Sequence, residues 1–311
     1  MITLRELQYL VALDEHRHFG RAAASCFVSQ PTLSGQFRKL ELQLGLELVE
    51  RHRHQVVITP SGKQLAQRAR TILADVKEFE QLAAAFKDPL TGDFHLGLVP
   101  TLGPYLLARI MSPLSRELPG LRFLLHEAQT AELLERLDAA ELDLLILPWT
   151  GDMEPFDCFE LFRERLLLAA TPGDPLLDAK RPGLSSLKGR LILTLQDGHC
   201  LRDDAMGYCF TAGATEDQRF RATGLETLRF MVASSIGITL MPELAVDPTR
   251  DSGIVYRHFS DPEPSRRIVA LMRRNYPRTA CVRRIVGLVR QVIEQENRSA
   301  ARPGSRTNQA D

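Results

Sequence analysis

The chain has 311 residues, which is enough for two domains or three small ones. Its 44% of hydrophobic and 25% of charged residues are typical of globular proteins and argue against a disordered, collagen-like or membrane class. The net charge is zero overall, but residues 1–70 hold ten lysines and arginines against six acidic residues. This local excess of positive charge is modest and suits a nucleic-acid partner.

The N-terminal stretch carries Arg5 and Glu6 among its apolar residues, so it lacks the unbroken apolar core of a signal peptide. No later stretch offers the roughly 18 charge-free apolar residues that a membrane helix needs. We therefore expect a cytoplasmic protein with no membrane partner. The cysteines are too few and too widely spaced for the framework of a small secreted domain, so we expect them to begin as thiols: Cys26, Cys158, Cys200, Cys209 and Cys281.

Short helices are predicted for the first 60 residues, because apolar side chains recur there at helical spacing. The first helix has one apolar face, the second is rich in small residues and the third repeats large apolar side chains: Leu4, Leu7, Leu10 and Val11; Ala22, Ala23 and Ala24; Leu33, Phe37, Leu40 and Leu44. Gly45 ends the third helix, and residues 56–58 follow as a candidate β-ribbon or wing.

The segment from Phe19 to Leu44 predicts a helix-turn-helix. Ser29 can cap the third helix, and Pro31 falls in its first turn, where a missing N–H costs little. Polar side chains of that turn then point outward toward base edges or phosphates, and arginines nearby suit phosphate contacts. The residues expected to contact DNA are Arg5, Gln30, Pro31, Thr32, Ser34, Gln36, Arg38, Arg51 and Arg53.

A capped amphipathic helix of some other bundle would also explain the third helix taken alone. The small-residue helix, the Ser-Gln-Pro cap, the wing and a long following helix come in order, however, and together they favour DNA binding. The long helix starts at Thr59, Pro60 and Ser61 and is expected to run to about Phe86. Its apolar positions recur in steps of four and three, which predicts a coiled-coil seam and a dimer: Leu65, Ala69, Ile72, Val76, Phe79, Ala83 and Phe86.

After a turn-rich linker at residues 88–93, apolar strands alternate with helices, which predicts an α/β region with mostly parallel sheets. The expected strands are 95–99, 122–126, 142–147, 190–195, 237–241 and 267–272, with helices such as 104–118 and 132–140 between them. Residues 182–189 punctuate the middle, which suits two subdomains joined by crossover strands. The domains expected are therefore a DNA-binding domain at 1–60, a linker helix at 61–87, an effector domain at 88–296 and a disordered tail at 297–311.

The segment RAAASCFVSQPTLSGQFRKLELQLGLELVER, residues 21–51, resembles the winged helix-turn-helix of LysR-type transcriptional regulators. The whole chain has the layout of that family. The resemblance implies an α/β protein with an N-terminal winged helix-turn-helix, a long dimerisation helix and a two-lobed effector domain like a periplasmic binding protein. It also implies that a dimer, or a dimer of dimers as a tetramer, binds a promoter site with dyad symmetry. Most members of the family sense a small molecule between the two lobes.

The segment DGHCLRDDAMGYCFTAG, residues 197–213, carries Cys200 and Cys209. A thiolate can attack the O–O bond of a peroxide, and cationic or hydrogen-bonding neighbours such as His199 and Arg202 could hold its charge. The product is a sulfenic acid, with which a second thiol condenses, and Cys209 is the nearest candidate. If residues 201–208 are helical, the two Cα atoms lie roughly 13 Å apart, whereas a disulfide tolerates no more than about 7 Å. Oxidation must then change the conformation.

Two other readings of these cysteines come from their spacing alone. Both can be small buried hydrophobic residues. A metal site would have only three ligands, His199, Cys200 and Cys209, at no familiar spacing, so we expect no metal and no cofactor. The remaining cysteines, Cys26, Cys158 and Cys281, lie in apolar surroundings and are expected in the core.

Further segments resemble the peroxide-sensing members of the LysR-type family: GHCLRDDAMGYCF, VPTLGPYLL at 99–107, HEAQT at 126–130 and FRATGLETLRFMVASSIGITLMP at 220–242. This resemblance runs through nearly the whole chain, although residues 52–55 of the wing and the C-terminal tail depart from the pattern. It implies that Cys200 reacts with peroxide and Cys209 resolves the product. It also implies a peroxide pocket lined by Thr101, Thr130, His199 and Arg266, with Arg267 as the alternative to the last.

The sequence therefore predicts a regulator of oxidative-stress genes that is activated by oxidation of Cys200 and a disulfide with Cys209. Its partners would be promoter DNA, hydrogen peroxide, RNA polymerase and further copies of itself. A LysR-type regulator of a small organic effector is the nearest alternative. A thiol-dependent redox enzyme is a further one, but the chain lacks a C-x-x-C motif and its DNA-binding part would then have no use.

Overall fold

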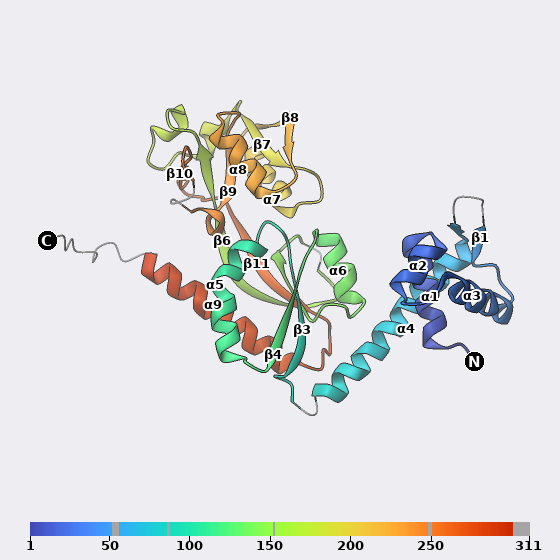
Figure 1. The fold of residues 1–311 in the computed structure, drawn as a ribbon. Helices are drawn as coiled ribbons and strands as arrows, with labels where there is room; N and C mark the ends of the chain where they lie inside the picture. Colours follow the sequence, from blue (N-terminus) through green and yellow to red (C-terminus); the bar gives the residue numbers. More distant parts are fainter. Residues whose placement is uncertain (52–55, 86–87, 152, 248–250, 301–311) are drawn as a thin grey trace. The chain divides into compact units, whose positions relative to one another are not determined.

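The structure is a computed structural model that describes residues 1–51, 56–85, 88–151, 153–247 and 251–300 (Figure 1). It separates into an N-terminal unit, which holds Met1–Phe86, and a second unit that contains most of the remaining chain. The predicted Arg53 contact and residues 301–311 of the predicted tail lie outside the described residues.

The N-terminal unit is a three-helix domain with a two-stranded wing, followed by a long helix. Its elements are α1 (Leu4–His16), α2 (Phe19–Ser25), α3 (Gln30–Leu44), β1 (Val49–Arg51), β2 (Val56–Ile58) and α4 (Pro60–Ala85). The wing strands β1 and β2 pair antiparallel, as expected for the ribbon at 56–58. Most of the predicted apolar positions are buried in one core that includes Leu10, Ala22, Ala23, Leu33, Phe37 and Leu40, whereas Leu4 and Ala24 are exposed.

Local chemistry fixes where these helices begin and end. Thr3 and Glu6 form a capping box at the start of α1, and Gly45 ends α3 in the left-handed conformation that glycine adopts without strain. The Thr59 hydroxyl accepts a hydrogen bond from the Gly62 N–H at 3.0 Å. Gly62 itself is required there, because an added Cβ would stand 2.2 Å from the carbonyl oxygen of Leu48. The predicted start of α4 is thus confirmed.

The second unit has two lobes, each with its own hydrophobic core. The first lobe contains β3 (Gly92–Leu98), α5 (Gly103–Glu117), β4 (Leu121–Glu127), α6 (Thr130–Asp138), β5 (Leu144–Pro148) and α9 (Thr279–Ala300). The second contains β7 (Leu191–Leu195), α7 (Cys200–Thr211), β8 (Thr215–Ala222), α8 (Leu225–Ala233), β9 (Thr239–Pro242), β10 (Val255–Arg257) and the 3-10 turns η1 (Pro175–Leu177), η2 (Leu184–Leu187) and η3 (Glu243–Ala245).

Two long strands connect the lobes, β6 (Asp157–Ala170) and β11 (Ser265–Met272). Leu161 of β6 packs in the first core, whereas Leu166 and Leu168 of the same strand pack in the second. In Figure 1 both strands span the lower and upper lobes of this unit, and they run in opposite directions. The expected crossover strands are therefore present, and the fold is the two-lobed α/β arrangement that the sequence predicted.

The sheet order corrects the expectation of mostly parallel sheets. The main sheet runs β10-β6-β11-β5-β3-β4, with β9 also paired to β6. Parallel pairing is found for β3 with β4, β3 with β5 and β7 with β8, while β11 and β6 pair antiparallel with their neighbours. The cause is that β6 leaves the first lobe and β11 returns to it, so the two strands run in opposite directions.

The C-terminal boundary also differs from the prediction. Helix α9 continues to Ala300, so residues 297–300 are helical and do not belong to a disordered tail. The side chains of Val282, Ile285 and Val289 are buried in the first core. This apolar face carries the helix past the last large apolar residue, because backbone hydrogen bonds propagate a helix that packing has already started.

Candidate functional site

The exposed face of α3 carries the predicted DNA-contacting side chains. Gln30, Pro31, Thr32, Gln36 and Arg38 are exposed and Ser34 is half-buried. Leu33, Phe37 and Leu40 turn the opposite face of α3 into the core. Hydrophobic anchoring on one side therefore leaves a polar surface on the other, as a recognition helix requires.

The start of α3 is capped as predicted. The Ser29 hydroxyl accepts a hydrogen bond from the Thr32 N–H at 3.3 Å, and the hydroxyl oxygens of Ser29 and Thr32 lie 2.7 Å apart.

Among the described residues, two predicted DNA-contacting residues lie outside α3. Arg5 is exposed on α1 and donates from Nε to the Tyr9 hydroxyl at 3.0 Å. Arg51 ends strand β1 in the wing. These residues belong to one compact unit with α3.

Cys200 is the first residue of α7 and is only 6% exposed. It packs in the hydrophobic core of the first lobe, whereas the other buried residues of α7 pack in that of the second. Its neighbour His199 is also buried and caps the helix without a side-chain hydrogen bond. Gly198 has φ +92°, and a Cβ there would stand 2.5 Å from Oε1 of Gln129. This close approach brings the loop before α7 against the start of α6, where Thr130 lies.

Arg266 is the cation whose charge lowers the pKa of the Cys200 thiol. Its guanidinium is fully buried and donates from Nε to Glu164 Oε2 at 2.7 Å, from Nη1 to Thr101 Oγ1 at 3.2 Å and from Nη2 to the Thr101 carbonyl at 3.0 Å. Glu164 in turn accepts a hydrogen bond from the Leu244 N–H at 3.1 Å. The guanidinium is thus held in one orientation by contacts from both sides.

The structure distinguishes Arg266 from Arg267, the alternative arginine for the peroxide pocket. Arg267, the next residue of β11, points to the other face of the strand, where its guanidinium lies 4.3 Å from the centre of the Trp149 ring. It also pairs with Glu160 at 3.9 Å. Arg266 is therefore the arginine beside Cys200.

Burial raises the pKa of the Cys200 thiol, and the charge of Asp204 raises it further. Arg266, the Thr130 hydroxyl and a backbone contact of Leu201 act in the opposite direction but do not outweigh burial. Thr130 Oγ1 is close enough to favour the thiolate, yet it is buried and makes no hydrogen bond of ordinary geometry with the described residues. At neutral pH the thiol therefore retains its proton until it reacts.

Cys209 lies at the far end of the same helix. It is fully buried in the core of the second lobe, and burial raises the pKa of its thiol to about 12. Cys200 packs against the core of the first lobe. Both are free thiols, and nine helical steps separate their Cα atoms by about 13 Å. As expected, a disulfide between them requires α7 to unwind.

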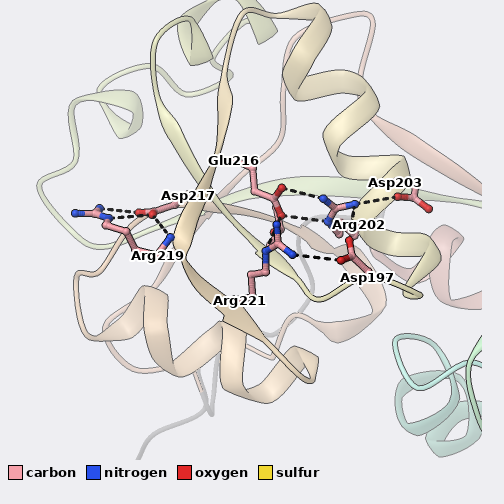
Figure 2. Close-up of polar contacts among 8 residues, drawn as sticks. Asp197, Arg202, Asp203, Glu216, Asp217, Arg219 and Arg221 are labelled. Carbon is pink, nitrogen blue, oxygen red and sulfur yellow. Dashed lines mark hydrogen bonds and ion pairs between the residues drawn. The ribbon is translucent and has the colours of Figure 1, made fainter.

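Arg202 does not face Cys200, contrary to the sequence expectation. Figure 2 shows it turned to Glu216 of β8, which it contacts through Nη2 at 2.8 Å, while Nη1 lies 3.2 Å from Asp197. Residues two apart on a helix point in different directions. Arg221 of β8 reaches Asp197 at 3.2 Å, so the ion pairs tie the loop before α7 and its first turn to β8.

The remaining cysteines divide between core and surface. Cys281 is fully buried, as expected. Cys26 is half-buried, and Cys158 is exposed, which corrects its prediction as a core residue. Cys158 lies in the first half of β6, where inward and outward side chains alternate, and it takes an outward position.

Sequence reasoning missed Glu164 and Asp204. Glu164 belongs to a strand that the pattern did not predict. Asp204 follows Cys200 by four residues, a spacing that places both on one face of a helix and could have indicated it. Among the described residues no group of three His, Cys, Asp or Glu side chains could hold a metal ion. Nor is any helix of this part of the chain long and apolar enough to cross a bilayer.

Two family models match the chain: "Bacterial regulatory helix-turn-helix protein, lysR family" over residues 4–63 and "LysR substrate binding domain" over residues 87–294. The chain therefore belongs to the LysR family of transcriptional regulators. Within that family it is 48% identical over 294 residues to the "Hydrogen peroxide-inducible genes activator" of Dickeya chrysanthemi, covering 94% of this chain and 96% of the relative. It is 50% identical over 277 residues to the "DNA-binding transcriptional dual regulator OxyR" of Escherichia coli K12, covering 89% and 91%.

Solved structures agree with this similarity. A full-length OxyR variant from Pseudomonas aeruginosa matches with a TM-score of 0.72 and 31% identity, over 93% of this chain and 95% of that one. Oxidised and reduced forms of OxyR each match with a TM-score of 0.62, at 44% and 41% identity, over 67% of this chain and 99% of theirs. The chain thus resembles proteins known in two redox forms.

Proposed function

We propose that this protein is a peroxide-sensing transcription regulator in which Cys200 reacts with hydrogen peroxide and Cys209 closes a disulfide. The observation that carries the proposal is the buried Cys200 thiol, whose pKa is raised by burial and lowered by the fixed Arg266 guanidinium and the Thr130 hydroxyl, with a second thiol on the same helix. Its relatives bear the names of hydrogen peroxide-inducible activators.

The chemistry has two steps. The Cys200 sulfur attacks one peroxide oxygen, so that an S–O bond forms, the O–O bond breaks and water leaves. The Cys209 sulfur then attacks the sulfenic acid, forming the S–S bond and releasing a second water. Two thiols are oxidised and one peroxide is reduced. Arg266, Thr101, Thr130 and His199 would bind the peroxide oxygens and stabilise the leaving one.

The disulfide becomes a signal through α7. Because Cys200 packs in one core and Cys209 in the other, joining them rebuilds the helix and the contacts of both lobes. In this proposal the chain has a DNA-binding domain at 1–60, a linker helix at 61–87 and an effector domain at 88–296. The DNA-contacting residues are those predicted on α1, α3 and the wing, and the partners are promoter DNA, RNA polymerase and further copies of the chain, in the cytoplasm.

The exposed apolar residues of α4 support self-association. Ile72, Phe79 and Leu82 are exposed along the part of α4 that follows its packed first turns. Water-exposed apolar stripes of this kind pair with a second helix. A dimer, alone or within a tetramer, is the assembly that this surface favours.

The test combines thiol counting with DNA footprinting. A small excess of peroxide should remove two thiols from the wild type, yield one intramolecular disulfide between Cys200 and Cys209 in peptide mapping, and change the DNA footprint. Cys200→Ser should abolish all three effects, while Cys158→Ser, at an exposed cysteine, should abolish none. If Cys200→Ser still changed its footprint on oxidation, the sensing role of Cys200 would be wrong. The alternative, a regulator that senses a small organic effector, would then be favoured.

A further inference from the structure

Asp204 is a second ionisable side chain on the Cys200 face of α7. It follows Cys200 by four residues, so the two side chains lie on the same side of the helix, about one turn apart. The carboxyl oxygen Oδ2 is buried and makes no hydrogen bond with the described residues. Its charge is near enough to raise the pKa of the thiol. A buried carboxyl oxygen without a partner beside a reactive thiol needs an explanation.

The surroundings of Asp204 balance its two protonation states. Burial, the charge of Asp203 on α7 and the charge of Glu164 on β6 favour the neutral acid, while Arg266 on β11 favours the carboxylate. The result is a carboxyl pKa of about 6. A group with a pKa near the working pH can both accept and donate a proton during one reaction.

The Cys200 reaction needs such a group. The thiol keeps its proton at neutral pH, and the oxygen that leaves peroxide must gain one. Arg266 cannot accept the thiol proton, because its guanidinium is permanently charged and already committed to Glu164 and Thr101. Asp204 is the buried carboxyl with an unpartnered oxygen on this face of α7.

We propose that Asp204 carries a proton from the Cys200 thiol to the leaving oxygen of peroxide; this inference rests on the proposed function. The Asp204 carboxylate takes the thiol proton and leaves a thiolate. The thiolate sulfur attacks one peroxide oxygen, the O–O bond breaks, and the Asp204 acid returns its proton to the departing oxygen as water. Cys–SH and H2O2 thus give Cys–SOH and H2O, and the carboxylate is regenerated.

The experiment compares two reagents on the full-length protein, wild type and Asp204→Asn. Peroxide needs a proton for its leaving group, whereas iodoacetamide needs a thiolate but releases iodide without a proton. Rates at Cys200 are read by quenching and peptide mass spectrometry. We expect Asp204→Asn to lower the peroxide rate constant by about 100-fold. Its alkylation rate should stay equal or rise, because the charge that raises the thiol pKa is gone.

The pH profile supplies a second measurement that does not depend on the variant folding. The wild-type peroxide rate should rise through about pH 6 and then level off, because the reactive protein needs one proton shared between the thiol and the carboxyl. In Asp204→Asn this inflection should be absent. Asp178→Asn is the matched control, since this aspartate is exposed and lies outside α7, and its peroxide rate should stay within about twofold of the wild type.

Three outcomes would overturn the inference. They are an unchanged peroxide rate in Asp204→Asn, an equal loss of peroxide and iodoacetamide reactivity, and a wild-type profile without the inflection. Each leaves the sensing role intact, provided that wild-type Cys200 still reacts with peroxide. If wild-type protein reacted no faster than Cys200→Ser, the proposed function itself would fail.

Discussion

Two adjacent arginines on β11 show that the direction of a side chain determines which groups it can contact. Arg266 is fully buried against Glu164 and Thr101, and Arg267 lies on the opposite face over the Trp149 ring. They are the same residue type, yet only Arg266 lowers the pKa of the Cys200 thiol. The sheet's alternation of faces makes this difference, and the register of β11 fixes it.

Replacement of Arg266 by lysine tests whether geometry matters beyond charge. Lysine keeps one positive charge but cannot contact Glu164 and Thr101 at once, so the cation would no longer be fixed beside the sulfur. We expect Arg266→Lys to lower the peroxide rate constant of Cys200 by about tenfold or more, which corresponds to a rise of about 1.4 kcal/mol in the activation free energy. Arg267→Lys is the matched control, and an equal loss in both variants would contradict the assignment.

The site could be predicted from sequence only where its residues lie in recognisable motifs. Thr101, Thr130 and the two cysteines of α7 stand in such segments. Glu164 does not, because the charged residues of FELFRER at 159–165 are typical of a surface strand. Only the fold turns this carboxylate inward, where it is 2% exposed. Asp204 was likewise missed, since partial burial and an absent partner exist only in three dimensions.

Helix α7 is the element whose stability opposes the disulfide. Its first turn is tied to β8 through Arg202 and Glu216, and its buried face packs in both cores. Gly207 is a weak point in this helix, because glycine costs about 1 kcal/mol relative to alanine in a helix. An added Cβ there would meet nothing within 4 Å, so alanine fits without strain.

We predict that Gly207→Ala makes the disulfide harder to form. If α7 unwinds on oxidation, the added helix stability of about 1 kcal/mol belongs to the reduced form alone. The midpoint potential of the Cys200–Cys209 couple should then become less negative by about 20 mV, measured by equilibration in thiol redox buffers. Gly287→Ala in α9 adds a methyl group at an equally open helical position and should leave the potential unchanged. An unshifted potential in Gly207→Ala would mean that α7 stays helical at that point.

Arg38 of helix α3 is expected to contribute to the salt dependence of DNA binding. Arg38 is exposed on the face opposite the buried Phe37, where it is expected to contact a phosphate. Arg38→Ala should weaken binding to all DNA sequences alike and reduce the slope of log affinity against log salt by about 0.9 for each bound protomer. Lys180→Ala, at an exposed lysine of the effector part, is the control. A loss confined to one base sequence would instead show that Arg38 reads a base.

At the scale of the whole molecule, sequence patterns predicted the architecture better than the pairing of strands. Local periodicity is enough to predict α3, α4 and the alternation of strands and helices. It carries no information on where β6 and β11 pass between lobes, because the direction of a strand depends on the path of the connections around it. The same limit applies to α4, whose apolar stripe indicates a partner that the single chain does not contain.

The exposed apolar stripe of α4 predicts a dimer contact at Phe79. Phe79 is 73% exposed in the isolated chain, although burying such a side chain is worth about 1.5–3 kcal/mol. Two copies paired along α4 would bury it twice, so Phe79→Lys should raise the dimer dissociation constant by at least about 100-fold. Sedimentation equilibrium would measure this, with Glu80→Lys, one residue along the same helix, as the control. Because dyad DNA needs two heads, Phe79→Lys should also bind half-sites only, while the peroxide reaction of Cys200 continues at the wild-type rate. A dimer that survives Phe79→Lys would place the main self-contact in the second unit instead.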